Sequence, residues 1–184
     1  VCPQSYAFCS KSPKHRNDKR FNEWLAGLID GDGCLLISKA GYCSLEITVE
    51  SCDEPMLIYI QNKLGGSTKA RSGVNAVRYR LHNKEGMLDL VYHINGLCRN
   101  LVRIAQLKNI CEHLNVPFID PQPLTADSFW YSGFFDAEGA VTFSMKEYGS
   151  NGKKRPQLSI SVSNKHQANV VDFQSCFSGS VYYD

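Results

Sequence analysis

Apolar and polar residues alternate in several short stretches of the chain, which is the pattern of a strand with one buried face. Leu45, Ile47 and Val49, for example, are separated by polar residues. The segments "KAGY" and "SGVN" lie between such stretches and are typical of turns. The predicted strands are residues 34–38, 44–51, 67–71, 76–82, 140–146 and 157–164, with a further strand beginning at 180–184 and a long turn at 147–156.

Helices are predicted between the strand pairs. The first begins at Asn22, a candidate N-cap, and Gly33 is placed to stop it. The second has Asp53 as a plausible cap and Pro55 in its first turn. The predicted helices are residues 22–31, 53–66, 84–95, 101–114, 128–137 and 166–179. Helices and antiparallel strand pairs in this order predict an α+β fold.

This pattern of elements occurs twice. "LAGLIDGDG" begins at Leu25 and "YSGFFDAEG" begins at Tyr131, so matching positions are 106 residues apart. The only two tryptophans of the chain share this offset. Further along, Leu45 matches Leu158 at an offset of 113, because the second copy has seven more residues in its hairpin turn. The chain therefore contains an internal duplication.

The duplication defines the expected domain organisation. Asp184 corresponds to Arg71 of the first copy, so we expect the second copy to be incomplete. The chain opens at Val1 rather than methionine, which suggests a processed chain or a fragment. The expected segments are a basic N-terminal extension (residues 1–21), a first repeat (22–116), a proline-rich linker (117–127) and a second repeat (128–184).

Composition changes this picture little. The apolar fraction of 43% and the charged fraction of 21% are ordinary for a soluble globular protein, and no apolar run is long enough for a membrane span. The net charge of +2 says little about partners, but residues 11–20, 67–80 and 153–156 are locally basic. The eight cysteines form no C-x-x-C pair and have no zinc spacing with the five histidines, so buried free thiols are expected.

The repeated nine-residue motif carries the candidate chemistry. Small residues four apart, Gly27 and Gly31 in one copy and Gly133 and Ala137 in the other, would let two helices approach closely. Such packing would bring two acids, Asp32 and Glu138, side by side at the helix C-terminal ends. Both the helix dipole and mutual repulsion disfavour paired carboxylates there, and a divalent cation such as Mg²⁺ removes the conflict.

The alternative is a purely structural helix pair whose acids are solvated or capped. The first acid of each motif, Asp30 or Asp136, is expected to face outward or to cap neighbouring backbone.

With these motifs and this element order, the chain resembles a LAGLIDADG homing endonuclease of the single-chain, two-repeat type. The resemblance covers residues 22–184. It implies two pseudo-symmetric αββαββα repeats, whose antiparallel sheets form a saddle over DNA, with the second repeat truncated here. It implies that Asp32 and Glu138 bind catalytic Mg²⁺ or Mn²⁺, and that main-chain carbonyls at Gly31 and Ala137 complete the metal shell.

The resemblance also implies further site residues. A polar residue near the end of the second strand positions the attacking water, and the matches are Ser51 and Asn164. A basic residue before the last helix contacts the scissile phosphate, and the matches are Arg99 or Arg103. No counterpart of this basic residue is found in the second copy.

An antiparallel ribbon can enter the major groove and present alternate side chains to base edges, while loop cations contact phosphates. The candidate nucleic-acid contacts are Lys39, Glu46, Thr48, Lys69, Arg71, Arg78 and Arg80 in the first copy, Ser144, Lys146, Ser159 and Ser161 in the second, and Lys153, Lys154 and Arg155 in the predicted turn.

The leading hypothesis is therefore a Mg²⁺-dependent, site-specific endonuclease acting on double-stranded DNA as a pseudo-symmetric monomer, unless a partner completes the second repeat. The alternative is a cleavage-inactive relative that binds intron RNA or ribosomal RNA, as a maturase or as a recruited component of a larger organellar assembly. A metal-dependent phosphatase is a third class, disfavoured because the chain lacks a His/Asp cluster. The resemblance points to mitochondria, with chloroplasts as the alternative, and to no membrane partner.

Overall fold

The computed structural model describes residues 18–148 and 152–183. Most of the expected basic extension lies outside these residues. Its last part belongs instead to the first helix, since α1 spans Lys19–Asp32 and begins three residues before Asn22. Asp18 is the N-cap, because its carboxylate accepts a hydrogen bond from the Phe21 amide at 3.1 Å.

Asn22 was therefore wrongly predicted as the cap. It lies within α1, where its Oδ1 is 2.6 Å from Nδ1 of the buried His93. The burial of Phe21, which is only 3% exposed, explains why the helix extends one turn further toward the N-terminus.

The first unit continues through the predicted series of strands and helices. Its elements after α1 are β1 (Gly33–Ile37), β2 (Cys43–Glu50), the 3₁₀ helix η1 (Ser51–Asp53), α2 (Glu54–Leu64), β3 (Ser67–Ala70), β4 (Ala76–Leu81), α3 (Lys84–Ile94) and α4 (Leu101–Leu114). Asp53 precedes α2 as predicted but makes no side-chain capping bond, and Gly65 ends the helix with φ of 77°.

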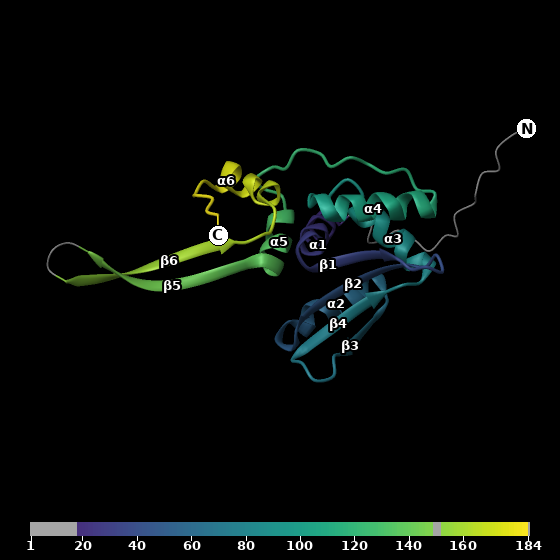
Figure 1. The fold of residues 1–184 in the computed structure, drawn as a ribbon, viewed down its shortest axis with the longest axis horizontal. Coiled ribbons are helices and arrows are strands. Elements are labelled where there is room, and N and C mark those ends of the chain that lie inside the picture. Colours follow the sequence, from purple (N-terminus) through teal and green to yellow (C-terminus); the bar gives the residue numbers. More distant parts are fainter. Residues whose placement is uncertain (1–17, 149–151, 184) are drawn as a thin grey trace, which may run out of the picture.

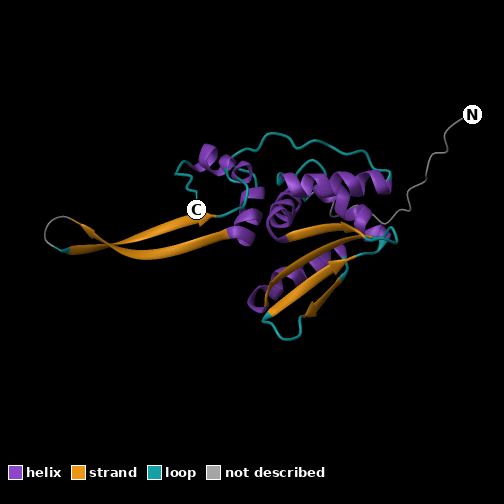
Figure 2. Cartoon of the chain, viewed as in Figure 1, coloured by secondary structure: helices purple, strands orange, loops and turns teal. Residues whose placement is uncertain are grey.

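The four strands form one antiparallel sheet in the order β1-β2-β4-β3. Its inner face carries the alternating apolar residues of β2, and Leu45 and Ile47 are fully buried opposite Leu81 and Tyr79 of β4. α4 packs against β1, α3 against β2 and α2 against β4. The helices thus cover one face of the sheet and leave the other open (Figure 2).

The second unit follows the linker and repeats the first half of this order. It contains α5 (Trp130–Glu138), β5 (Gly139–Tyr148), β6 (Lys153–Val162), the 3₁₀ helix η2 (Gln167–Asn169) and α6 (Val171–Phe177). β5 and β6 form a two-stranded antiparallel sheet. The two sheets extend to opposite sides of the α1–α5 pair (Figure 1).

Three boundaries in the second unit differ from prediction. The hairpin strands continue into the predicted long turn, because Tyr148 pairs with Lys153 and the Arg155 guanidinium lies 5.0 Å from the Tyr148 ring centroid. The predicted helix at 166–179 is divided into η2 and α6 around Val170, whose φ of −117° departs from helical values. Residues 180–183 form no strand, since a strand needs a hydrogen-bonded neighbour and no third strand joins β6 within the described residues.

The two motif helices α1 and α5 pack against each other and form the centre of the molecule (Figure 1). A Cβ added to Gly27 would lie 2.7 Å from the Phe134 amide nitrogen, and one added to Gly133 would lie 2.9 Å from that of Leu28. Both pairs are related by the 106-residue offset, so the interface is pseudo-symmetric. Gly31 and Ala137 also face each other across it.

Each motif helix donates a hydrogen bond from its tryptophan to an aspartate of the other helix, and we call these two bonds the exchanged tryptophan bonds. Trp24 Nε1 donates to Asp136 Oδ2 at 2.8 Å, and Trp130 Nε1 donates to Asp30 Oδ2 at 2.7 Å. Of the two alternatives expected for the first acid of each motif, Asp136 lies at the surface, whereas Asp30 is fully buried and bonds neighbouring backbone by accepting the Arg99 amide. An indole donor and a main-chain donor make that burial possible.

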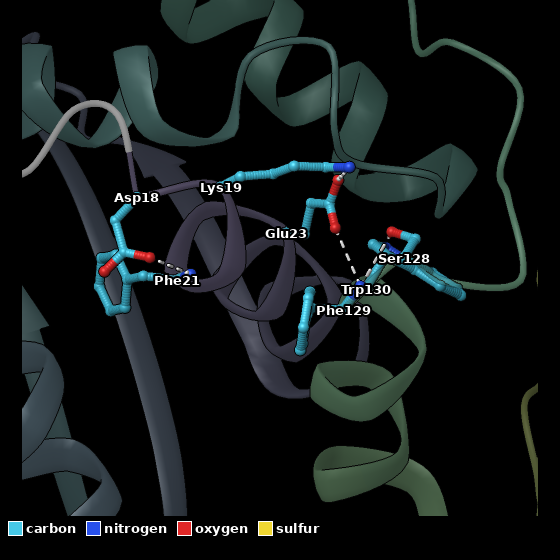
Figure 3. A network of polar contacts seen from close by, with 7 residues as sticks. All are labelled: Asp18, Lys19, Phe21, Glu23, Ser128, Phe129 and Trp130. Carbon is cyan, nitrogen blue, oxygen red and sulfur yellow. Dashed lines mark hydrogen bonds and ion pairs between the residues drawn. The ribbon is translucent and has the colours of Figure 1, made fainter.

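The N-terminal end of α5 is capped by α1 (Figure 3). Glu23 accepts a hydrogen bond from the Phe129 amide at 2.9 Å, and Ser128 Oγ accepts one from the Trp130 amide at 3.2 Å. Lys19 Nζ lies 3.6 Å from Glu23 Oε1, which makes an ion pair within α1. A carboxylate at a helix N-terminus satisfies orphan N–H groups and complements the helix dipole.

One face of the β5–β6 hairpin is apolar and exposed. Phe143 pairs with Leu158 and Val141 pairs with Ile160 on this face, and these side chains are between 61% and 74% exposed. The matching residues of β2 are buried beneath α2 and α3. In the described part of the chain, therefore, the second unit lacks the layer that covers the first.

The cysteines and the hydropathy of the helices agree with the composition. The six cysteines within residues 18–148 and 152–183 are free, and Cys43, Cys98 and Cys111 are buried. Among the helices described, none is long and apolar enough to cross a membrane.

Candidate metal and nucleic-acid site

Two acids lie at the ends of the packed helices. Asp32 is the last residue of α1 and Glu138 is the last residue of α5. Each is followed by a glycine with extended backbone, Gly33 or Gly139. A Cβ on Gly33 would lie 2.7 Å from the Ile29 Cα, so glycine is needed here for close approach to the helix and not for a left-handed conformation.

The two acids are close to each other, because a Cβ added to Gly31, the neighbour of Asp32, would lie 3.1 Å from Glu138 Cγ. Burial raises the pKa of Asp32 to about 6, and the negative charge of Glu138 adds to this increase. Burial also raises the pKa of Glu138 above its usual range. The positive charge of Arg103 opposes the increase at both carboxylates. The raised pKa values mean that a negative charge on these carboxylates is disfavoured when no cation is bound. A divalent cation between them would remove this cost.

Glu138 is bonded by Asn164, which is in turn oriented by Asn169. Asn164 Nδ2 donates to Glu138 Oε1 at 3.3 Å. Asn164 Oδ1 accepts hydrogen bonds from Asn169 Nδ2 at 2.8 Å and from the His166 amide at 3.2 Å. Because these two donors occupy the carbonyl oxygen, the amide nitrogen of Asn164 must face the carboxylate.

Arg103 extends from the first turn of α4 toward the same place. Its Nε donates to the Ile29 carbonyl at 3.2 Å, and its Nη1 donates to Gln106 Oε1 at 3.1 Å. A cavity of about 440 Å³ opens beside it. The lining residues are Gly31, Asn100, Val102, Arg103, Glu138, Ser163, Asn164, Lys165 and His166.

The other predicted site residues lie elsewhere. Ser51 begins η1, where its amide donates to the Asn75 carbonyl at 3.3 Å, and it does not line the cavity. The Arg99 guanidinium donates to the Gln122 carbonyl in the linker. Of the two arginines predicted for phosphate contact, the structure therefore places Arg103 at the cavity and turns Arg99 away from it.

Sequence reasoning missed several residues that line or adjust this site. Lys165, His166 and Asn100 line the cavity, and the charge of Asp53 contributes to the raised pKa of Asp32. The 113-residue offset already contained part of this signal. It aligns Asn164-Lys165-His166 with Ser51-Cys52-Asp53, so one half of the site is basic where the other is acidic.

The chemistry of the donor set fits a hard divalent cation. Asp32 and Glu138 supply carboxylate oxygens, and Mg²⁺ commonly combines one or two carboxylates with water and phosphate oxygens. No cluster of three or more His, Cys, Asp or Glu residues occurs in the described ranges, so the protein itself offers few ligands.

The predicted nucleic-acid side chains of the first sheet share its open face. The register places Glu46 and Thr48 of β2 opposite Arg80 and Arg78 of β4. On the other edge of β4, Lys69 of β3 lies opposite Arg78. Glu46 forms ion pairs with Arg80 at 3.1 Å and with Arg78 at 3.5 Å. Lys39 lies in the β1–β2 turn and Arg71 directly follows β3.

The second sheet has a matching polar face. This polar face carries the pairs Ser144–Gln157 and Lys146–Arg155, and also Ser159 and Ser161. The assignment of Lys153, Lys154 and Arg155 to a turn was wrong, because these residues belong to β6. Alternation places Lys153 and Arg155 on the polar face and Lys154 on the apolar face.

Comparison with known proteins identifies the family. A protein-family model described as LAGLIDADG endonuclease matches residues 25–114 of the sequence. These residues contain the first motif and the whole first sheet. The chain belongs to the LAGLIDADG endonuclease family. Its second motif helix and second hairpin lie beyond the matched residues and give it the paired arrangement of the two-repeat type.

Among LAGLIDADG relatives, the intron-encoded RNA maturase bI4 of Saccharomyces cerevisiae is 52% identical over 90% of this chain and 25% of its own length. The probable intron-encoded endonuclease aI2 of Debaryomyces hansenii is 45% identical over 95% of this chain and 28% of its own length. The chain thus spans about a quarter of the length of these two relatives.

The fold of solved LAGLIDADG proteins agrees with this structure. The meganuclease I-AabMI, solved bound to uncleaved DNA, aligns with a TM-score of 0.60 at 20% identity, covering 88% of this chain and 73% of that one. This likeness establishes the architecture of paired antiparallel sheets around two motif helices.

Proposed function

We propose that the protein is a site-specific endonuclease that binds double-stranded DNA beneath its two polar sheet faces and cleaves it with Mg²⁺ or Mn²⁺. The observation that carries the proposal is the convergence of Asp32 and Glu138 at the ends of two packed helices. The solved relative I-AabMI is described as bound to DNA, and the D. hansenii relative is named a probable endonuclease, which supports a DNA target.

In this proposal the bound cations would polarise the scissile phosphate and lower the pKa of the attacking water. Asp32 and Glu138 would hold the cations, with the carbonyls of Gly31 and Ala137 as further ligands. Asn164 orients Glu138 through its amide. Arg103 would offset the negative charge that develops on the phosphate, since it lines the same cavity.

RNA binding is a second candidate function, and the specific observation that favours it is the 52% identity to a protein named an RNA maturase. The same basic faces that would contact DNA phosphates can contact RNA phosphates. Under this candidate the protein assists splicing of its own intron or binds a larger organellar RNA. Both candidates place it in mitochondria, in keeping with relatives named as intron-encoded.

The test is a cleavage assay on DNA spanning the intronless insertion site. We expect double-strand cleavage with Mg²⁺ or Mn²⁺ and binding without cleavage with Ca²⁺. Asp32→Asn and Glu138→Gln are expected to lower the rate by about a thousandfold or more while retaining DNA binding. The matched control is Asp136→Asn, an acid of the same helix end that is bonded to Trp24.

The result that would overturn the endonuclease proposal is equal binding of DNA or RNA by wild type and both acid variants with no cleavage by any of them. Splicing of the intron RNA by the same three proteins then tests the second candidate. A maturase would splice normally with either acid replaced.

A further inference from the structure

The first acid of the LAGLIDGDG motif, Asp30, holds the loop that precedes α4. Its Oδ2 accepts hydrogen bonds from the Arg99 amide at 2.5 Å and from Trp130 Nε1 at 2.7 Å. Its main-chain oxygen accepts a third from Asn100 Nδ2 at 2.8 Å. Asp30 is fully buried, so these contacts are shielded from solvent competition.

These contacts continue into α4. Asn100 is the N-cap of that helix, and its Oδ1 accepts a hydrogen bond from the Val102 amide at 3.0 Å. One residue later, Arg103 Nε donates to the Ile29 carbonyl at 3.2 Å. The first turn of α4 is therefore bonded to the last turn of α1 at Ile29 and Asp30, and Asp30 is two residues before Asp32.

The pseudo-equivalent acid of the second motif is used differently. Asp136 accepts the indole N–H of Trp24 in a solvent-exposed contact. Of the two acids, Asp30 is the one bonded to the loop before α4. The chain therefore contains a natural control, since both acids make the exchanged tryptophan bond and one of them also organises the arginine.

We propose that Asp30 is a positioning residue that acts through Arg103, by fixing the loop before α4 so that the guanidinium stays beside the ends of α1 and α5. The proposal rests on the proposed function only for the consequence that Arg103 contacts a bound phosphodiester. Both side-chain partners of Asp30 are N–H donors, so what they require of this residue is an acceptor oxygen, which asparagine also offers.

Three variants separate these roles. Asp30→Ala removes the acceptor, Asp30→Asn retains an acceptor oxygen without the charge, and Asp136→Ala removes only the exchanged tryptophan bond of the other motif. The first readout is solvent exchange of the Arg103 Nε–H, followed by ¹⁵N NMR. We expect roughly tenfold faster exchange in Asp30→Ala, and rates close to wild type in Asp30→Asn and Asp136→Ala.

The second readout is the rate of DNA cleavage. Asp30→Ala is expected to lower kcat by about as much as Arg103→Gln does, with little change in KM, and the double variant is expected to be no slower than either single one. Asp30→Asn restores the rate. The proposal is overturned if Asp30→Ala leaves Arg103 exchange unchanged, if Asp30→Asn does not rescue it, or if Asp136→Ala has the same effect.

The proposal stays testable if a variant fails to fold or if the wild type does not cleave DNA. If Asp30→Ala does not fold, Asp30→Leu replaces it, because leucine is close to aspartate in shape and fills the buried site without offering an acceptor. Faster exchange at Arg103 in that variant supports the proposal, and unchanged exchange overturns it. If wild type does not cleave DNA, the endonuclease function fails, and the exchange measurement alone then decides the positioning role.

Discussion

Asp30 and Asp32 are two residues apart and differ in surroundings. Asp30 lies in the helix interface, where burial raises its pKa to about 7 against the lowering effect of the Arg99 and Trp130 hydrogen bonds. Asp32 lies at the helix end, where burial and Glu138 raise its pKa to about 6. A motif with alternating acids thus places one acid inside the helix packing and the other at the helix end, close to Glu138.

The raised pKa of Asp30 predicts a pH dependence of stability. Its folded pKa of about 7 exceeds the unfolded value of 3.8, so the folded state holds the proton more tightly. The resulting stability is fully present below pH 3.8 and is lost as pH rises through about 7. As pH rises from about 4 to about 7, Asp30→Asn should therefore lose less thermal stability than wild type. Equal losses in the two proteins, measured by calorimetry, would contradict this.

The glycines of the interface predict a steric effect. Gly27→Ala and Gly133→Ala each place a methyl group against the facing backbone, at 2.7 Å and 2.9 Å from an amide nitrogen. Neither backbone can yield without moving a whole helix, so we expect a loss of about 3 kcal/mol in unfolding free energy for each. Urea titration measures this, with the exposed Ser132→Ala as control. Wild-type stability in both glycine variants would exclude close packing of α1 and α5.

At the scale of single residues, sequence reasoning succeeded where the duplication supplied a second observation. The close approach at Gly27 and Gly133 and the proximity of Asp32 and Glu138 follow from two motifs in register. The burial of Asp30 did not follow, because an aspartate gives no local sign that an indole from another helix will satisfy it. The roles of Asp32 and Glu138 in metal binding and catalysis stay predictions.

At the scale of elements, α5 depends on α1 for its N-terminal cap. Phe129 cannot cap a helix itself, and Glu23 accepts its amide hydrogen bond from the neighbouring helix. We predict that Glu23→Ala costs about 1 kcal/mol in unfolding free energy, while Glu23→Gln, which keeps an acceptor, costs less. Chemical denaturation of the two variants measures the difference, and equal losses would show that only packing is involved.

The apolar face of the β5–β6 hairpin predicts self-association of the 184-residue chain. Leu158 and Ile160 are 71% and 74% exposed, on a sheet that no third strand joins within residues 18–148 and 152–183. Replacing both with serine should raise the monomer fraction in size-exclusion chromatography with light scattering. A control with Gln157→Ala, on the polar face, should leave association unchanged. A monomeric wild type at the same concentration would contradict the prediction.

The strands of the first unit were predictable because each has a buried face and therefore alternates. Helix ends were less predictable, since Asp18 and Asn22 are both acceptable caps and only the burial of Phe21 decides between them. The hairpin length in the second unit was underestimated because glycine, proline and lysine in residues 150–156 are typical of turns. Cross-strand pairing, such as that of Glu147 with Lys154, outweighs these local preferences.

At the scale of the whole molecule, two units of unequal extent meet at one symmetric interface. The described first unit has four strands and covering helices, whereas the second has two strands. Both units contribute equally to the helix interface and to the pair of acids. Arg103 and the covered core belong to the first unit, and the basic cavity residues Lys165 and His166 belong to the second. The pseudo-two-fold relation thus holds at the interface and is lost away from it.

The fold at this scale was predictable from the repeat and its resemblance to a known family, and the solved meganucleases confirm it. The uncovered hairpin face was implied only indirectly, since alternation predicts a buried face without saying what buries it. Which nucleic acid is bound cannot follow from basic residues alone, because phosphates are common to DNA and RNA.

The central claim is that Asp32 and Glu138 together hold divalent cations. Mn²⁺ binding, measured by electron paramagnetic resonance on wild type, Asp32→Asn, Glu138→Gln and the double variant, tests it most directly. We predict that each single variant loses about tenfold or more in affinity and that the double variant loses less than the sum of the two effects, because the acids act on shared ions. Wild-type affinity in both single variants, or fully additive losses from two independent sites, would contradict the claim.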